Sequence, residues 1–359
     1  MAGGFGTRLR PLSCTLPKIL FPIAGRPMIE WVLDNLSRNG IDEAVLATSY
    51  MADMIRRHLG RRFEGVRLHY SLEETPLGTG GAIKKAERYL KNGDFFVLNS
   101  DIIASPPLRG IHRNHVATDA TATIMLHKVK DPTHFGVAQL DRSLKIARFI
   151  EKPRLEDAPS RWINAGVYAL DPEILNHLDP GRKISVEKEV FPELAASGRL
   201  YGYKYTGEWF DIGRFEEYRQ ANIAVLSGLS RTRPAVAPKV KADAGVRLIP
   251  PLKVGSRSTV RTDATLGPNS SVGEAVVIGE RSRVIGSILF NKVHVGRDSF
   301  VEGAVIGEGA VVGDSVRISD GCVIGDHVYI HDDVILTKDV TVCPHKEVNR
   351  SITRPRIVT

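Results

Sequence analysis

The last third of the chain carries an aliphatic residue at every sixth position, a period that few folds allow. Two runs of six, separated by an interruption around Phe290 and Asn291, make up the pattern: Val254, Val260, Leu266, Val272, Ile278 and Val284, then Ile306, Val312, Ile318, Ile324, Ile330 and Leu336. An α-helix repeats every 3.6 residues, so it does not explain a strict period of six. The pattern predicts a left-handed parallel β-helix of hexapeptide repeats, whose aliphatic residues point into a stacked core.

The interruption lies between Val284 and Val295, and it gathers Ile288, Leu289 and Phe290. We expect a loop that leaves the coil there, with apolar residues that cover the N-terminal domain or another subunit. Residues from about 245 onward are therefore expected to mediate self-association, giving a homo-oligomer, and to contribute no chemistry.

The N-terminal part alternates between helical and strand-like segments. Residues 27–39, 52–59 and 79–90 are expected to be helices, whereas residues 41–47 and 95–98 are expected to be strands. Such alternation predicts an α/β fold, a Rossmann-like and mostly parallel sheet covered on both faces. Ligands of such sheets bind beyond the carboxyl ends of the strands.

The change of pattern divides the chain into three expected parts. Residues 1–228 form one domain and residues 252–359 the β-helix. Residues 229–251 hold four prolines and few large apolar side chains, which is typical of a linker.

Composition excludes several classes of protein. The chain has 359 residues and a net charge of +8, but its basic residues are scattered, which argues against nucleic acid and fits small anionic ligands. No apolar run is long enough to span a membrane. Three distant cysteines, Cys14, Cys322 and Cys343, argue against zinc and disulfides and favour the cytoplasm.

The chain begins with the glycine-rich run Gly3-Gly4-Phe5-Gly6-Thr7-Arg8-Leu9-Arg10-Pro11-Leu12, followed by Pro17-Lys18. Glycines let backbone N–H groups approach a polyphosphate, and Arg8 and Lys18 add the positive charge that phosphoryl transfer needs. No Gly-Lys-Ser/Thr follows, so the run is not a Walker loop.

Further polar motifs follow expected strands. Asp101 comes after residues 95–98, and a second acid lies in Trp209-Phe210-Asp211-Ile212-Gly213. Either acid could hold Mg²⁺, although Asp101 could also serve only as a turn former, and spacing alone does not pair the two. Glu151-Lys152 could bind a sugar phosphate or be a surface ion pair. His112 and His115 are expected on the surface of a helix.

Together these motifs resemble the sugar-phosphate nucleotidylyltransferases, and among them the mannose-1-phosphate guanylyltransferases, over essentially the whole chain. Besides the glycine-rich run, the resemblance is carried by these segments: Glu74-Thr75-Pro76-Leu77-Gly78-Thr79, Leu98-Asn99-Ser100-Asp101, Phe149-Ile150-Glu151-Lys152-Pro153, Ile163-Asn164-Ala165-Gly166, Ser185-Val186-Glu187-Lys188-Glu189-Val190-Phe191-Pro192, Trp209-Phe210-Asp211-Ile212-Gly213, Pro344-His345-Lys346 and Pro355-Arg356-Ile357.

The resemblance implies that the chain binds an NTP and a sugar 1-phosphate and releases pyrophosphate and an NDP-sugar, with Mg²⁺ as cofactor. It implies catalytic roles for Arg8, Lys18 and Asp101, and a metal held by Asp101 and Asp211. The nucleotide would contact Gly3, Gly4, Gly6, Thr7, Arg8, Lys18, Pro76, Gly78, Thr79 and Asn99. The sugar phosphate would contact Gly136, Glu151, Lys152, Asn164, Gly166 and Glu187.

GTP and mannose 1-phosphate are the favoured substrates, with glucose 1-phosphate and UTP, dTTP or ATP as the alternative. Two other hypotheses stay open: a non-catalytic subunit that binds NDP-sugar, and a bifunctional enzyme whose β-helix transfers acyl groups with His294, His327 or His331 as base.

The chain departs from the family in three places. The apolar first strand before the glycine-rich run is missing, so we expect unpaired sheet backbone and a start site upstream of Met1. Ile19 replaces a common proline, and Gly80 replaces a common alanine.

Overall fold

The computed structural model describes all 359 residues and divides into two compact units. The first comprises residues Met1–Gly4 and Ile29–Asp211, and the second comprises residues Phe5–Met28 and Ile212–Thr359. The chain thus passes from one unit to the other inside the glycine-rich run and again inside Trp209-Phe210-Asp211-Ile212-Gly213.

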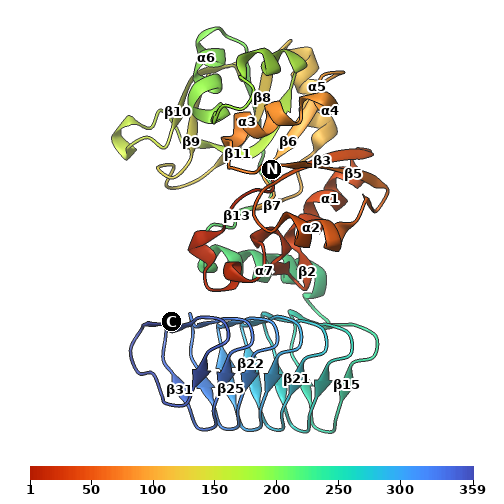
Figure 1. The fold of residues 1–359 in the computed structure, drawn as a ribbon, viewed down its shortest axis with the longest axis vertical. Helices are drawn as coiled ribbons and strands as arrows, with labels where there is room; N and C mark the ends of the chain where they lie inside the picture. Colours follow the sequence, from red (N-terminus) through yellow and green to blue (C-terminus); the bar gives the residue numbers. More distant parts are fainter. The chain divides into compact units, whose positions relative to one another are not determined.

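The first unit is built on a mixed sheet (Figure 1). Six strands pair in the order β10-β9-β11-β8-β12, with β6 joined to β11: β6 (Phe95–Leu98), β8 (Ala122–Lys128), β9 (Gly136–Leu140), β10 (Ile146–Glu151), β11 (Trp162–Leu170) and β12 (Leu200–Lys204). Only β12 and β8 pair in parallel there, and the other pairs are antiparallel. Two smaller sheets complete the unit: β3 (Glu43–Thr48) with β5 (Val66–Leu72) and β4 (Arg62–Phe63), and β7 (Ile102–Ala104) with β13 (Trp209–Asp211).

The α/β class is confirmed, but the sheet is mixed rather than mostly parallel. Tight turns reverse the chain where helical crossovers were expected. Between β9 and β10, for example, the Asp141 carboxylate accepts hydrogen bonds from the backbone N–H groups of Ser143 and Lys145, at 2.8 and 3.0 Å. An aspartate that bonds its own turn in this way favours a hairpin.

The helices largely follow the expected ranges. They are α1 (Met28–Arg38), α2 (Ala52–Leu59), α3 (Gly78–Lys85), α4 (Glu87–Leu90), α5 (Leu108–Ala117), α6 (Phe191–Ala196) and, in the second unit, α7 (Phe215–Ser230). Residues 79–90 form two helices, which meet at Ala86. The surface prediction is wrong for His115, which is 2% exposed: it faces β8, where its Nδ1 lies 2.9 Å from the Thr123 hydroxyl. None of these helices is long and apolar enough to span a membrane.

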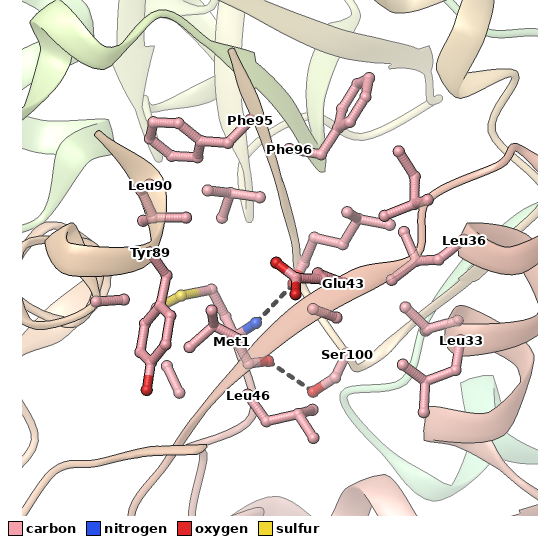
Figure 2. A pocket seen from close by; sticks show the side chains of 18 of the residues that line it. Met1, Leu33, Leu36, Glu43, Leu46, Tyr89, Leu90, Phe95, Phe96 and Ser100 are labelled. Carbon is pink, nitrogen blue, oxygen red and sulfur yellow. Dashed lines mark hydrogen bonds between the residues drawn. The ribbon is translucent and has the colours of Figure 1, made fainter. Parts of the chain in front are cut away.

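An apolar cavity of about 480 Å³ lies in the first unit, among the residues of β3 and β6 (Figure 2). Each of these strands pairs on one side only, β3 with β5 and β6 with β11. The Met1 amine donates to the Leu98 carbonyl at 2.8 Å, and the Ala2 N–H donates to the Ala47 carbonyl at 2.8 Å. The one-sided pairing agrees with the expected unpaired sheet backbone. Burial lowers the pKa of the Met1 amine to about 6.

The β-helix of the second unit consists of three parallel sheets (Figure 1). The first holds β14 (Ala235–Val236), β17 (Leu252–Val254), β20 (Ser270–Val272), β23 (Ile288–Leu289), β26 (Val305–Ile306), β29 (Val323–Ile324), β32 (Thr341–Val342) and β34 (Ile357–Val358). The second holds β15 (Lys241–Ala242), β18 (Thr259–Val260), β21 (Val277–Ile278), β24 (His294–Val295), β27 (Val311–Val312), β30 (Tyr329–Ile330) and β33 (Glu347–Val348). The third holds β16 (Arg247–Leu248), β19 (Thr265–Leu266), β22 (Arg283–Ile285), β25 (Phe300–Glu302), β28 (Arg317–Ile318) and β31 (Ile335–Leu336).

The predicted β-helix is confirmed, and all twelve ladder residues are at most 1% exposed. The expected loop around Phe290 is wrong, because the coil is only shortened there. Val254 pairs with Val272, eighteen residues on, whereas Val272 pairs with Leu289, seventeen on. Gly286 turns this short side at φ +59°, a conformation that glycine adopts without strain. Leu289 therefore stays in the core, at 1% exposed.

Residues 235–248, which the sequence assigned to a linker, form the first coil. Their strands β14, β15 and β16 pair in parallel with β17, β18 and β19. Val240, Val246 and Leu248 pack against one end of the core and are only partly buried, as expected for a terminal coil.

Residues Phe5–Met28 also belong to the second unit. They contain three short 3₁₀ turns, η1 (Thr7–Leu9), η2 (Leu12–Cys14) and η3 (Lys18–Leu20), and the hairpin β1 (Pro22–Ile23) and β2 (Arg26–Pro27). Tyr218 on α7 donates a hydrogen bond to the Pro22 carbonyl at 2.6 Å, which ties the hairpin to this helix.

Candidate active site

A second cavity in the first unit, of about 170 Å³, collects most of the predicted sugar and metal residues. Its lining consists of Asn99, Asp101, Ile102, His134, Phe135, Gly136, Glu151, Asn164, Gly166, Tyr168, Glu187, Trp209 and Asp211. These residues come from several strands and their following turns, so the cavity depends on the pairing of the sheets.

The two predicted metal-binding acids both line this cavity. Asp101 immediately precedes β7, and Asp211 ends β13, where it pairs with Ile102. Sequence spacing could not relate two acids so far apart, but the antiparallel pairing of β7 and β13 brings them to one end of a two-stranded sheet. The cavity therefore has two carboxylates that come from distant parts of the chain.

This donor set fits Mg²⁺. Carboxylate and amide oxygens are the ligands that the ion takes from proteins, and Asn99 and Asn164 add amides to the same cavity. No group of three or more His, Cys, Asp or Glu side chains that could hold a metal ion is present. A Mg²⁺ ion here would complete its shell with water and phosphate oxygens, as it commonly does.

Glu187 is the centre of the polar network on another wall of the cavity. Its carboxylate accepts hydrogen bonds from the hydroxyls of Thr79 at 2.6 Å, Ser185 at 2.7 Å and Tyr168 at 3.2 Å. Tyr168 in turn accepts a hydrogen bond from the Asn164 amide at 2.9 Å. Glu187 is thus held in place by three donors, and the predicted loop residue Thr79 is one of them.

Glu151 lies beside Gly136 at the end of the β9–β10 hairpin. A Cβ added to Gly136 would lie 2.8 Å from the Glu151 carboxylate and 2.4 Å from the Phe149 ring, so only glycine leaves room for this carboxylate. Burial raises the pKa of Glu151, and the Lys152 ammonium, 3.7 Å away, opposes the rise. Lys152 itself does not line the cavity, and its side chain is 63% exposed.

Asn99 and Gly166 both line the cavity and contact each other directly. The Asn99 N–H donates to the Gly166 carbonyl at 2.9 Å, and the Gly166 N–H donates to the Asn164 side chain at 2.9 Å. Gly166 has φ +73°, and a Cβ there would lie 2.9 Å from the Asn99 amide. Glycine at this position therefore leaves room for the Asn99 side chain, and the predicted contact of Gly166 with a sugar phosphate stays a prediction.

The predicted nucleotide-binding segment Glu74-Thr75-Pro76-Leu77-Gly78-Thr79 and the following Gly80 are hydrogen-bonded to the segment before Glu187. The Gly80 N–H donates to the Ile184 carbonyl at 2.8 Å, and the Ile184 N–H donates to the Leu77 carbonyl at 2.9 Å. A Cβ on Gly80 would lie 2.7 Å from the Ile184 side chain, which explains why glycine stands where the family commonly has alanine. Pro76, which precedes α3, and Gly78, the first residue of α3, do not line the cavity.

The charged end of the first glycine-rich run lies in the second unit, with Arg8 and Lys18, whereas Gly3 and Gly4 lie in the first. Gly6 has φ +59°, and the Ser13 hydroxyl donates to its carbonyl at 2.8 Å. Arg8 follows in η1, and a Cβ on Gly213 would lie 3.5 Å from its guanidinium. The residues predicted to bind the nucleotide therefore belong to both units.

Sequence reasoning missed five cavity residues: Ile102, His134, Phe135, Tyr168 and Trp209. The Trp209 indole donates to the Ala165 carbonyl at 3.0 Å and packs edge-on against Phe135, with ring centroids 5.6 Å apart. Tyr168 follows Asn164-Ala165-Gly166 by two residues on β11, so strand alternation could have indicated it.

The β-helix histidines contact one another and neighbouring acids. His327 stacks on His345 with ring centroids 5.1 Å apart, and His331 is hydrogen-bonded to Glu347. No acyl-donor motif lies beside them in the sequence, so these contacts give the acyl-transfer hypothesis no further support.

The chain matches two family models and many named relatives. Residues 1–228 match the nucleotidyl transferase model, and residues 248–358 match the GMPPB C-terminal domain. The chain is 33% identical to mannose-1-phosphate guanylyltransferase 1 of Arabidopsis thaliana over 100% of this chain and 98% of that protein. It is 34% identical to mannose-1-phosphate guanylyltransferase of Mycobacterium tuberculosis, over 84% of this chain and 82% of that protein.

Solved structures show the same fold for about two thirds of the chain. A putative glucose-1-phosphate thymidylyltransferase from Bacillus anthracis in complex with a sucrose has a TM-score of 0.57 and 26% identity, over 62% of this chain and 92% of that one. HddC from Yersinia pseudotuberculosis complexed with GMP-PN has a TM-score of 0.53 and 28% identity, over 62% and 96%. From the family models and the identity to full-length relatives, we conclude that the chain belongs to the nucleotidyl transferase family.

Proposed function

We propose that this chain transfers a nucleotidyl group from an NTP to a sugar 1-phosphate, and that the substrates are GTP and mannose 1-phosphate. The observation that carries the proposal is that one cavity is lined by both predicted metal ligands, Asp101 and Asp211, and by predicted sugar-binding residues. These are Glu151, Asn164 and Glu187. Carboxylates and amides of this kind hydrogen-bond sugar hydroxyls, and the two acids suit a metal that binds phosphates. The choice of GTP and mannose rests on the names of the relatives.

In the proposed reaction, a phosphate oxygen of the sugar 1-phosphate attacks the α-phosphorus of the NTP in line. The bond from that phosphorus to the bridging oxygen breaks, and pyrophosphate leaves with the electron pair. Arg8 and Lys18 neutralise the charge that develops, and Lys152 binds the sugar phosphate. Mg²⁺ held by Asp101 and Asp211 would supply further charge neutralisation. No covalent protein nucleophile is needed, so positioning and electrostatics provide the catalysis.

Three wider statements belong to the same proposal. Residues 1–228 are the nucleotidyltransferase domain, and the β-helix domain begins with the coil of residues 235–248 rather than at residue 252. The ranges of the two family models, 1–228 and 248–358, support this division. The protein acts in the cytoplasm. It is a homo-oligomer that associates through the β-helix. The reason is that the apolar core is open at the last coil of a β-helix and has to be covered by other residues.

The test is pyrophosphate release across a grid of GTP, ATP, UTP and dTTP with mannose and glucose 1-phosphates. We expect the highest kcat/KM for GTP with mannose 1-phosphate. If kcat/KM is highest for UTP or dTTP with glucose 1-phosphate, the chain is a glucose-1-phosphate nucleotidyltransferase instead. Tight binding of GDP-mannose without turnover for any pair would favour the non-catalytic subunit.

A further inference from the structure

Thr79 and Glu187 are predicted to belong to different sub-sites, but a hydrogen bond joins them. The family resemblance assigns Thr79 to the nucleotide and Glu187 to the sugar phosphate. In the structure the Thr79 hydroxyl donates to Glu187 Oε2 at 2.6 Å, and it accepts a hydrogen bond from the Val186 N–H at 3.0 Å. Glu187 lines the cavity that also contains Asp101 and Asp211, whereas Thr79 does not line it. The Thr79 hydroxyl is therefore linked to the cavity through Glu187.

The Thr79 hydroxyl has one proton to donate, and Glu187 accepts it. A threonine hydroxyl is a single donor with two acceptor lone pairs. The 2.6 Å distance to Glu187 Oε2 is typical of a hydroxyl that donates to a carboxylate, which is the stronger kind of hydrogen bond. The Val186 N–H occupies one of the lone pairs. The Thr79 hydroxyl therefore cannot donate to a nucleotide without losing its bond to Glu187.

The donors around Glu187 are divided unequally between its two carboxylate oxygens. Oε2 accepts from Thr79 and Ser185, at 2.6 and 2.7 Å, whereas Oε1 accepts from Tyr168 at 3.2 Å. An ionised carboxylate has about four acceptor sites, two on each oxygen. Oε1 thus keeps one site for a further donor, and a sugar hydroxyl is such a donor. Because Thr79 and Ser185 hold the other oxygen, they fix the direction in which Oε1 points.

Backbone hydrogen bonds hold the segments of Thr79 and Glu187 together independently of the two side chains. The Gly80 N–H donates to the Ile184 carbonyl at 2.8 Å, and the Ile184 N–H donates to the Leu77 carbonyl at 2.9 Å. These bonds fix the backbone on both sides of Thr79. Loss of the Thr79 hydroxyl should therefore change the orientation of the Glu187 carboxylate without displacing either segment.

We propose that Thr79 is a positioning residue for the sugar phosphate, that it acts by holding the Glu187 carboxylate, and that its hydroxyl does not bind the nucleotide. The inference rests on the proposed function, because it takes Glu187 as the acceptor of a sugar hydroxyl. It moves Thr79 from the nucleotide sub-site, where the resemblance assigned it, to the sugar sub-site. A carboxylate that is already held in one orientation loses less conformational freedom when the sugar binds, so the hydroxyl of Thr79 strengthens binding of the sugar.

Steady-state kinetics of full-chain variants test the proposal, with the substrate pair that gives the highest kcat/KM and each substrate varied in turn. Thr79→Val removes the hydroxyl and keeps the shape of the side chain. We expect it to raise KM for the sugar 1-phosphate about tenfold, while KM for the NTP changes less than about twofold. Thr118→Val is the matched control, because Thr118 is half-buried like Thr79 but donates to the Asn114 carbonyl of α5, at 2.9 Å. This control should keep both wild-type KM values.

Two further variants show whether Thr79 acts through Glu187. Thr79→Ser keeps the hydroxyl and should restore most of the affinity for the sugar 1-phosphate. In a Glu187→Ala background, Thr79→Val should raise KM no further, since both changes remove the same contact. Additive effects, an unchanged KM for the sugar 1-phosphate, or a rise confined to KM for the NTP would overturn the proposal. If Thr79→Val does not fold, Thr79→Ala, compared with Thr118→Ala, decides in the same way.

Calorimetric binding of GDP-mannose and of GDP provides a readout that requires no turnover. We expect Thr79→Val to raise Kd for GDP-mannose about tenfold and Kd for GDP less than about twofold, because only GDP-mannose carries the sugar. If the wild-type chain binds GDP-mannose but releases no pyrophosphate with any substrate pair, the proposed function fails, whereas the two Kd values still decide the role of Thr79. An equal rise for both ligands, or none for either, would contradict that role alone. A wild-type chain that neither turns over nor binds GDP-mannose would contradict both proposals.

Discussion

The β-helix and the mixed-sheet unit differ in how far apart in sequence their contacting residues lie. In the β-helix each strand pairs with a strand sixteen to eighteen residues away, so the contacts recur along the chain at a nearly constant spacing. In the mixed-sheet unit the cavity joins Asp101 to Asp211, and Thr79 bonds Glu187, 108 residues away. Periodic contacts leave a pattern in the sequence. Single long-range contacts leave only the residue types that make them.

The most severe test of this contrast is removal of the β-helix before Val254. Because Phe21 packs on Phe290 of the β-helix, we expect truncation to abolish nucleotidyl transfer as well as to lower the oligomeric state. Pyrophosphate release and light scattering measure the two effects. Full activity of the truncated chain would mean that the two regions are functionally independent, as the sequence alone suggested.

A smaller change, Asp101→Asn, tests the long-range pairing of the acids. The amide keeps the shape but removes the charge that a metal needs, so turnover should fall by about 100-fold or more at saturating Mg²⁺ while the fold remains. Asp211→Asn should behave alike if the two acids share one ion. A rate above about a tenth of the wild-type value would remove Asp101 from the mechanism.

Much of the fold could be predicted from the sequence, for reasons that differ between the units. The β-helix follows from its period, but two of its parts were misinterpreted. The shortened side at Gly286 was taken for a loop, because a missing residue and an inserted loop both interrupt a ladder, and the first coil, residues 235–248, was assigned to the linker. The direction of the strands in the sheet was not predictable, since it depends on turns such as that at Asp141. Residue types indicated Asp101, Glu151 and Asn164, but not that Trp209 and Tyr168 would join them.

Arg8→Ala, in the second unit, and Lys152→Ala, in the first, are expected to change different kinetic constants, kcat and KM respectively. Arg8 acts on charge that develops during transfer, so its loss should lower kcat by about 10- to 100-fold. Lys152 binds a phosphate that is present throughout, so its loss should chiefly raise KM for the sugar phosphate, by about tenfold. Steady-state kinetics with each substrate varied will show the split. The reverse pattern would exchange the two sub-sites.

The buried Met1 amine predicts a pH dependence in the mixed-sheet unit of the 359-residue chain. Its pKa falls from 8.0 to about 6, so between pH 6 and 8 the unfolded chain binds the proton and the folded chain does not. The free energy of unfolding should therefore rise with pH over this window, by about 2 to 3 kcal/mol, and level off above pH 8. Urea unfolding at pH 6 and 8 measures the rise, and Nα-acetylated protein, which lacks the titrating group, should not show it.

The smallest expected effect concerns the regularity of the β-helix. Most sides turn at one residue with positive φ, and non-glycine residues such as Ala275, at φ +53°, fill many of these positions. Gly286→Ala should therefore lower the free energy of unfolding by only about 1 kcal/mol, because a Cβ there meets no atom closer than 3.8 Å. Gly303→Ala, at the other shortened side, should be worse, since its Cβ would lie 1.8 Å from the Asp320 carboxylate. Urea unfolding midpoints of the two variants test the ranking. Equal losses would show that the short sides need glycine for its backbone alone, and not for the space that its missing side chain leaves.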